Sequence, residues 1–232
     1  MSLTESSAAA LQALAFLATI ALVALSVLVA IGFAIAGRAG RATILTTIAA
    51  AAVGAYAVTL VGVGVGSRER VLGPGEAKVF CELDCHLAYT VSRVRVVPAV
   101  DGMHARGAYY LVTLRTSFDE RTIAPWRGDA PHWPNPRRQR LVDSVGRAWT
   151  PDATAQRALV AMDAAGTPIE TPLRPGESYE TTLAFDVPPD VAGARLEVTD
   201  ADPVTRFMIG HENSPFHRKT VFALGRGFAT GR

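Results

Sequence analysis

The segment Gly37-Arg38-Ala39-Gly40-Arg41 is a short basic turn between two long apolar runs. The runs, Leu11–Ala36 and Thr43–Val65, contain no charged residue. Each is long enough as a helix to cross about 30 Å of hydrocarbon. The sequence therefore predicts a two-helix transmembrane hairpin within residues 1–66. Because basic residues in very short loops stay in the cytoplasm, the turn is expected to face inward. Both termini, and everything after Ser67, would then be extracytoplasmic.

The first apolar run is interpreted as a retained anchor. The lead Met1–Ala10 carries only one charged side chain, that of the acidic Glu5, so it lacks the basic region of a secretory signal. The run is also longer than the roughly 7 to 15 residues of a signal core. A cleaved signal peptide is the alternative.

Composition limits the remaining possibilities. The chain has 232 residues and a formal net charge of +2. Roughly 165 residues follow the hairpin, enough for one domain with its own core. So small a charge, without a dense Lys/Arg cluster, does not indicate nucleic-acid binding. The two cysteines would lie in an oxidising, metal-accessible compartment if the topology holds.

The part after the hairpin has the pattern of an all-β domain. A polar linker, residues 67–77, precedes it, and a short tail, residues 226–232, follows. Alternating patterns and turn signals over residues 78–225 predict an antiparallel β-sandwich of immunoglobulin-like type. Its expected strands are Val79–Val91, which Arg93–Val97 continues or pairs with, Tyr109–Phe118, two short strands within Arg140–Thr150, Ser178–Val187, Ala194–Thr199, Val204–Ile209 and Thr220–Leu224, with a short helix at Thr154–Met162.

Three motifs resemble a known family. They are Leu141-Val-Asp-Ser-Val-Gly-Arg-Ala-Trp, Leu173-Arg-Pro-Gly-Glu-Ser and Leu183-Ala-Phe-Asp-Val-Pro, and Leu87-Ala-Tyr-Thr-Val adds a first strand. In this order they are similar to the DUF4352 (telokin-like) family of bacterial exported or membrane-tethered domains, over roughly residues 79–199. The resemblance implies an immunoglobulin-like sandwich with a non-enzymatic role. The Pro-rich insertion and residues 211–217 depart from the family pattern, so a special function is expected there.

The segment Cys81-Glu-Leu-Asp-Cys85-His86 could bind a metal, because thiolates and imidazole suit copper or zinc. Two helices before a sandwich also resemble the layout of subunit II of haem-copper oxidases, whose copper motif contains Cys-x-x-x-Cys. That motif continues with His and Met where this chain has Tyr89 and Ser92. His211 and His217 could contribute further ligands if the first and last strands are neighbours.

Three interpretations of the cysteines stay open. In one regular strand, Cys81 and Cys85 would lie about 13 Å apart on one face. This is too far for a disulfide and typical of two buried free thiols in a core. A bulge or loop could bring them together as a disulfide, and the third interpretation is the metal site. Ser214 near the late histidines lacks a nucleophile-elbow context, so an enzyme is not expected.

Two surfaces are candidates for partner binding. The proline-rich loop Thr122–Arg138 holds Trp126 and Trp133, which could cap the sandwich, lie at the membrane interface or bind a partner. In the second helix, Thr46, Ala50, Gly54, Gly62 and Gly66 form a small-residue stripe, which is expected to pack on the first helix or on another protein.

The sequence thus predicts a non-enzymatic, membrane-tethered accessory or binding module of a bacterial envelope complex, with no cofactor. The alternative is a copper- or zinc-binding redox or metal-delivery protein of the envelope.

Overall fold

The computed structural model describes the backbone of residues 3–82, 85–120 and 126–225, and the side chains of residues 11–80, 87–120 and 126–225. The chain forms two compact units. The first comprises residues 1–68 and 202–218, and the second comprises residues 69–201 and 219–232. The segment 202–218, expected inside the sandwich, therefore clusters with the helices.

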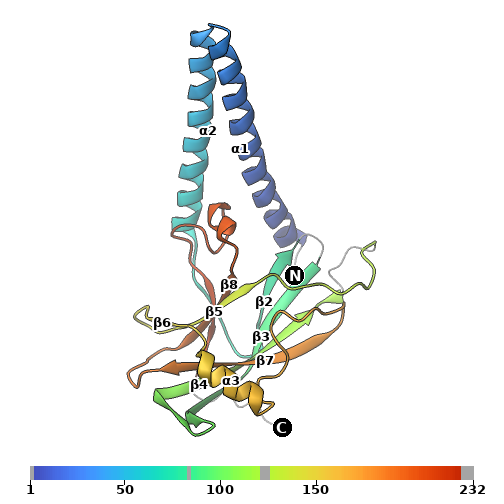
Figure 1. Cartoon of the computed structure of the whole chain (residues 1–232), viewed down its shortest axis with the longest axis vertical. Helices are drawn as coiled ribbons and strands as arrows, with labels where there is room; N and C mark the ends of the chain where they lie inside the picture. Colours follow the sequence, from blue (N-terminus) through green and yellow to red (C-terminus); the bar gives the residue numbers. More distant parts are fainter. Residues whose placement is uncertain (1–2, 83–84, 121–125, 226–232) are drawn as a thin grey trace. The chain divides into compact units, whose positions relative to one another are not determined.

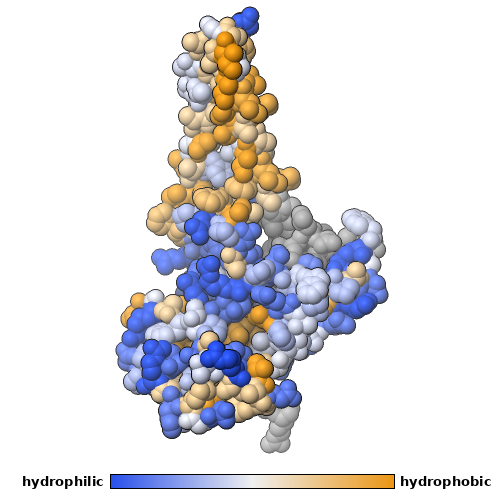
Figure 2. Space-filling model, viewed as in Figure 1, coloured by the Kyte–Doolittle hydropathy of each residue, from blue (hydrophilic) through white to orange (hydrophobic). Residues whose placement is uncertain are grey.

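The first unit is built on a helical hairpin. The helices are α1 (Leu3–Ile35) and α2 (Ala39–Gly66), joined by a turn in which Gly37 has a φ of +70°. They are in contact near this turn and diverge toward their other ends (Figure 1). Both contain apolar stretches long enough to cross a membrane. Their apolar side chains stay largely exposed, as the orange surface of the hairpin shows (Figure 2).

Covered positions on the two helices recur at spacings of three and four residues. This is the spacing of a left-handed antiparallel helix pair. The ring centroids of Phe16 and Tyr56 lie 6.4 Å apart within this interface. The covered or partly covered positions are Gln12, Ala13, Phe16, Thr19, Val23, Ser26, Ala30 and Phe33 on α1, and Ala42, Leu45, Ala49, Ala52, Tyr56, Leu60 and Gly64 on α2.

The second unit contains two β-sheets and one short helix. One sheet has the strand order β1-β9-β8-β5-β6 and the other β2-β3-β4-β7. Neighbouring strands are antiparallel except β1 and β9, which pair in parallel. The strands are β1 (Arg70–Leu72), β2 (Ala77–Glu82), β3 (Cys85–Val100), β4 (Met103–Phe118), β5 (Arg137–Val142), β6 (Ala148–Trp149), β7 (Ser178–Val187), β8 (Arg195–Asp200) and β9 (Thr220–Ala223), and the helix is α3 (Ala153–Ala161).

The two sheets share one hydrophobic core, so this unit is a β-sandwich. Tyr89 and Phe185 from one sheet and Leu196 and Phe222 from the other are fully buried in it. Alternation of apolar and polar residues along the strands produces this two-layer packing. A buried cation also joins the sheets: Lys78 Nζ in β2 donates to the carbonyl oxygens of Val198 (2.5 Å) and Thr220 (3.0 Å).

Most predicted elements are confirmed. Residues 109–118, 178–187 and 194–199 lie in or largely in strands β4, β7 and β8, and the helix predicted at 154–162 is α3. Asp152 caps α3 by accepting hydrogen bonds from the backbone N–H of Thr154 and Ala155. The two short strands expected within Arg140–Thr150 lie in β5 and β6, and Gly146 in the turn between them has a positive φ of +86°.

Two predicted strands are wrong. Val79–Val91 is not one strand, because the chain reverses between Glu82 and Cys85 and forms the β2–β3 hairpin. Apolar and polar residues alternate in the same way before and after the reversal, so the sequence pattern could not reveal the hairpin. Val204–Ile209 is also not a strand: residues Pro203–Phe207 form a 3₁₀ helix, η2. Its start is set by Pro203 and by the Asp202 carboxylate, which accepts from the N–H of Val204.

Candidate functional site

The loop between β4 and β5 presents two tryptophans to solvent. Trp126 is 87% exposed and Trp133 is 70% exposed. The interpretation that they fold back to cap the sandwich is therefore wrong. Residues 121–125 of the predicted loop lie outside the described residues. The described part, residues 126–136, is called the Trp loop below.

The Trp loop is held to the sandwich at its centre. His132 and Leu173 exchange two backbone hydrogen bonds of 2.9 and 3.0 Å. The His132 ring packs edge-on against Phe118, with ring centroids 6.1 Å apart, and the Arg127 guanidinium lies 5.1 Å from the Phe118 ring centroid. Trp126 and Trp133, which lie on either side of His132 in sequence, are thus exposed on a loop that is fixed to the sandwich. Two large, rigid side chains held in this way are suited to protein contact.

The small-residue stripe of α2 faces away from α1. A methyl group added at Gly54, Gly62 or Gly66 would meet no described atom within 4 Å. The expectation that this stripe packs on the first helix is wrong, because α1 covers a different face of α2. Gly54 and Gly62 therefore lie on an open helix face.

Gly64 lies on the covered face, and sequence analysis missed it. A Cβ at Gly64 would overlap the carbonyl oxygen of Pro215 and come within 3.3 Å of the backbone N of His217. Next to it, Ser67 Oγ accepts from the N–H of Arg218 (2.7 Å) and donates to the Gly64 carbonyl (2.7 Å). The glycine repeat Gly62-Val-Gly64-Val-Gly66 was a signal, but residue spacing alone could not identify the covered glycine.

The β2–β3 hairpin rearranges the predicted metal ligands. In the backbone register, Cys81 is paired with His86 and Glu82 with Cys85. The distance of about 13 Å between the cysteines assumed a single strand, so it no longer applies. The side chains of Cys81, Cys85 and His86 lie outside the described ones. Among the residues searched, which exclude those left undescribed, no group of three or more His, Cys, Asp or Glu is placed to hold a metal ion.

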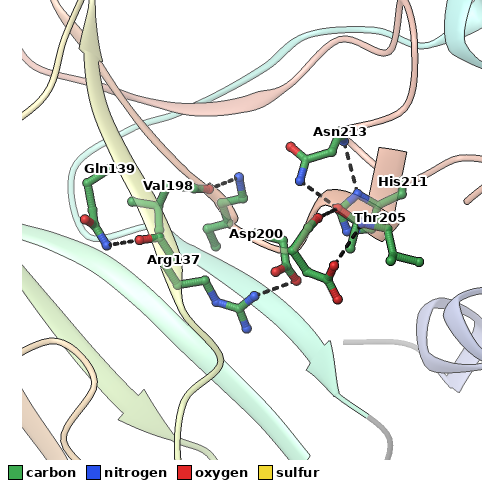
Figure 3. A network of polar contacts seen from close by, with 10 residues as sticks. Arg137, Gln139, Val198, Asp200, Thr205, His211 and Asn213 are labelled. Carbon is green, nitrogen blue, oxygen red and sulfur yellow. Dashed lines mark hydrogen bonds and ion pairs between the residues drawn. The ribbon is translucent and has the colours of Figure 1, made fainter. Parts of the chain in front are cut away.

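His211 and His217 belong to the first unit, whereas the cysteines belong to the second. His211 Nδ1 accepts from the N–H of Asn213 (3.1 Å), and Asn213 Nδ2 donates to Thr205 Oγ1 (2.9 Å). Figure 3 shows this group, and also the separate ion pair between Arg137 and Asp200 (2.8 Å) of the sandwich. These contacts explain His211 as a turn-forming residue of segment 202–218. Its role as a metal ligand stays a prediction.

A cleft of about 500 Å³ opens on the sandwich, along parts of β3 and β4 and beside the end of β7. Its lining is mainly apolar side chains and backbone, with Tyr110 as its one titratable side chain. Such a lining lacks the convergent charged groups typical of catalytic sites. Its lining residues are Val94, Val96, Gly107, Ala108, Tyr110, Val187, Pro188, Pro189, Val191 and Gly225.

Comparison with known proteins identifies no family. No family model matches the sequence, and no curated protein matches it. Among solved structures, the chain is similar to MPT63, a secreted protein from Mycobacterium tuberculosis. The identity is 13%, the alignment covers 67% of this chain and 98% of that chain, and the TM-score is 0.42. The DUF4352 resemblance stays a prediction.

Proposed function

We propose that this chain is a two-pass membrane protein whose extracytoplasmic, immunoglobulin-like sandwich is a non-enzymatic binding module of a bacterial envelope complex. The observation that carries the proposal is the pair of exposed tryptophans, Trp126 and Trp133, on a loop fixed to the sandwich. The open glycine face of α2 would add a second contact within the membrane.

Exposed tryptophan is costly for a protein without a partner, because each ring leaves a large apolar area in water. In protein interfaces, tryptophan is among the residues whose truncation costs the most binding energy. The backbone bonds between His132 and Leu173 restrict the loop before binding, so less conformational entropy is lost on association. These features favour docking of a protein surface at the Trp loop.

Membrane insertion is supported by the hairpin. Leu14, Leu25 and Leu28 of α1 are 61 to 67% exposed, which is favourable in lipid and unfavourable in water. Arg38 and Arg41 in the turn favour a cytoplasmic turn. The sandwich and both termini would then be extracytoplasmic.

Site-specific photocrosslinking in bacterial cells tests the partner surface. A benzophenone side chain would replace Trp126 or Trp133, with the 76% exposed Val145 of the β5–β6 turn as matched control. A protein adduct of one reproducible mass at 126 and 133, absent at 145, is expected. Its yield should fall when the other tryptophan is changed to alanine. Equal adducts at all three positions, or only lipid adducts at 126 and 133, would contradict the proposal.

The β2–β3 hairpin favours a second candidate, a copper- or zinc-binding protein. The reversal brings the backbone of Cys81, Cys85 and His86 together within one turn, which a continuous strand would not do. The full chain should then purify with one equivalent of metal that Cys81→Ser and Cys85→Ser abolish. If His211 and His217 take part, His211→Ala and His217→Ala should lower the metal content too. Metal-free protein after exposure to copper and zinc would eliminate this candidate.

A further inference from the structure

The segment 202–218 combines exposed apolar side chains with a backbone that bonds to itself. Val204 is 42% exposed, Phe207 52% and Phe216 69%. Along the same segment, a backbone N–H donates to the carbonyl three residues earlier at every third position. The donor and acceptor pairs are Thr205 to Asp202, Met208 to Thr205, His211 to Met208, Ser214 to His211 and His217 to Ser214, at 2.9 to 3.3 Å.

This combination lowers the cost of contact with lipid. Non-helical backbone at membrane depth is tolerated only where its polar groups have partners, because lipid supplies none. Side-chain bonds add to the turns: Ser214 Oγ donates to the carbonyl of His211 (2.7 Å), and Thr205 Oγ1 donates to that of Asp202 (2.6 Å). The segment can therefore leave water at a lower cost than an ordinary loop.

Contacts with both helices fix the segment between their open ends (Figure 1). Tyr56 Oη donates to the carbonyl oxygen of Phe207 at 2.7 Å. A Cβ at Gly210 would lie 2.8 Å from Gln12 Nε2 of α1 and 3.8 Å from Val63 Cγ1 of α2. The Pro215 carbonyl packs on Gly64, as described above. The segment thus occupies the space between α1 and α2.

The Tyr56 contact indicates the depth of the segment in the bilayer. With a rise of about 1.5 Å per residue, Tyr56 lies about 22 Å along α2 from Arg41. If Arg41 marks the inner edge of a hydrocarbon core about 30 Å thick, Tyr56 lies about 8 Å below the outer edge. A backbone carbonyl bonded to this side chain would lie in the outer part of the hydrocarbon core, among the acyl chains.

Phe216 supports this placement. Its φ of +62° is rare for a bulky residue and costs energy. Its ring is 69% exposed, and the preceding residue, Pro215, packs on Gly64 of α2. Two exposed arginines lie close to these rings in sequence: Arg206 directly precedes Phe207, and Arg218 follows Phe216 by two residues. Their positive charges are suited to phosphate groups.

We propose that segment 202–218 is an interfacial anchor, in which Phe207 and Phe216 insert among the acyl chains of the extracytoplasmic leaflet and Arg206 and Arg218 contact phospholipid phosphates. The anchor rests on the membrane insertion proposed above.

Photocrosslinking of the full chain in nanodiscs of phosphatidylglycerol and phosphatidylethanolamine tests the anchor. Benzoylphenylalanine would replace Phe207 or Phe216. Leu25, 61% exposed in the middle of α1, serves as positive control, and Val145 of the sandwich as negative control. Lipid adducts measured by mass spectrometry are expected at 25, 207 and 216 but not at 145.

Each other outcome has a defined meaning. Adducts at 25 without adducts at 207 and 216 would overturn the anchor and leave membrane insertion standing. No adduct at 25 would overturn insertion and the anchor with it. Adducts at 145 as strong as those at 207 would show that lipid contact is not specific to the segment, which also overturns the anchor. As a further control, the unsubstituted chain is crosslinked to photoactivatable lipids, and the crosslinked residues are located by peptide mapping. Lipid adducts in residues 202–218 of this chain would show that the substitutions did not create the lipid contact.

Discussion

Gly64→Ala should release segment 202–218 from α2. The added methyl would meet the carbonyl oxygen of Pro215, a backbone atom that cannot rotate away as a flexible side chain can. Either the segment shifts or α2 does. The matched control is Gly62→Ala, because a methyl at Gly62 meets no described atom within 4 Å.

The expected magnitude follows from the steric overlap, because the gain in helix propensity is the same in both variants and in both the docked and undocked states. Alanine stabilises a helix interior by about 0.8 to 1.0 kcal/mol relative to glycine, and both variants gain this in α2. Only Gly64→Ala adds steric overlap, which costs about 1 to 3 kcal/mol in a packed interface. At 1.4 kcal/mol per factor of ten, the undocked state of the segment should become about 5 to 150 times more populated.

Hydrogen exchange of the amides of residues 203–217, in nanodiscs, measures this population. Exchange should accelerate by that factor in Gly64→Ala and stay unchanged in Gly62→Ala. Tyr56→Phe, which removes the hydroxyl bonded to Phe207, should accelerate it by a smaller factor, since such bonds in membranes are worth about 0.6 kcal/mol on average. Equal exchange in the two glycine variants would refute the docking described here.

Three further predictions concern the sandwich, and urea unfolding of the detergent-solubilised chain checks each. Burial raises the pKa of the Asp143 carboxyl, but hydrogen bonds from Arg147 and from the backbone outweigh burial and hold this pKa below its usual range. The free energy of unfolding should therefore fall as the pH drops through the acid range below about 4. Asp143→Asn should make the free energy of unfolding less dependent on pH in this range. Burial raises the pKa of Tyr179 to about 12 from 10.0, so stability should be lost as pH rises through this interval, and Tyr179→Phe should remove that loss. Lys78→Met should lower the free energy of unfolding by about 1.5 to 3 kcal/mol, because the carbonyls of Val198 and Thr220 lose a charged hydrogen-bond donor. An unchanged free energy of unfolding would show that Lys78 does not join the sheets.

Much of the fold could be predicted because its elements depend on local chemistry. The helices follow from two long apolar runs that contain no charged residue. Strand β4 follows from its run of aromatic and β-branched residues, β7 from alternation, and the β5–β6 turn from Asp143 and Gly146. Each of these features is decided by residues close together in the chain.

The candidate sites were less predictable. Trp126 and Trp133 could be selected as unusual residues, but their exposure depends on the pairing of His132 with Leu173, far along the chain. Gly54 and Gly62 could be selected as small residues, but which face α1 covers depends on the rotation of two packed helices. The β2–β3 hairpin was hidden because the apolar and polar residues alternate in the same way before and after the reversal.

The sequence by itself determined the membrane-type hairpin, the β-rich second unit and most of their boundaries, because hydrophobic length, alternation and turn residues act locally. Only the tertiary structure decided that residues 202–218 leave the β pattern and pack between α1 and α2. That choice depends on Tyr56 meeting the carbonyl of Phe207 and on Gly64 meeting Pro215, contacts across roughly 150 residues of chain. Contacts at this separation leave no periodic trace in the residues that make them.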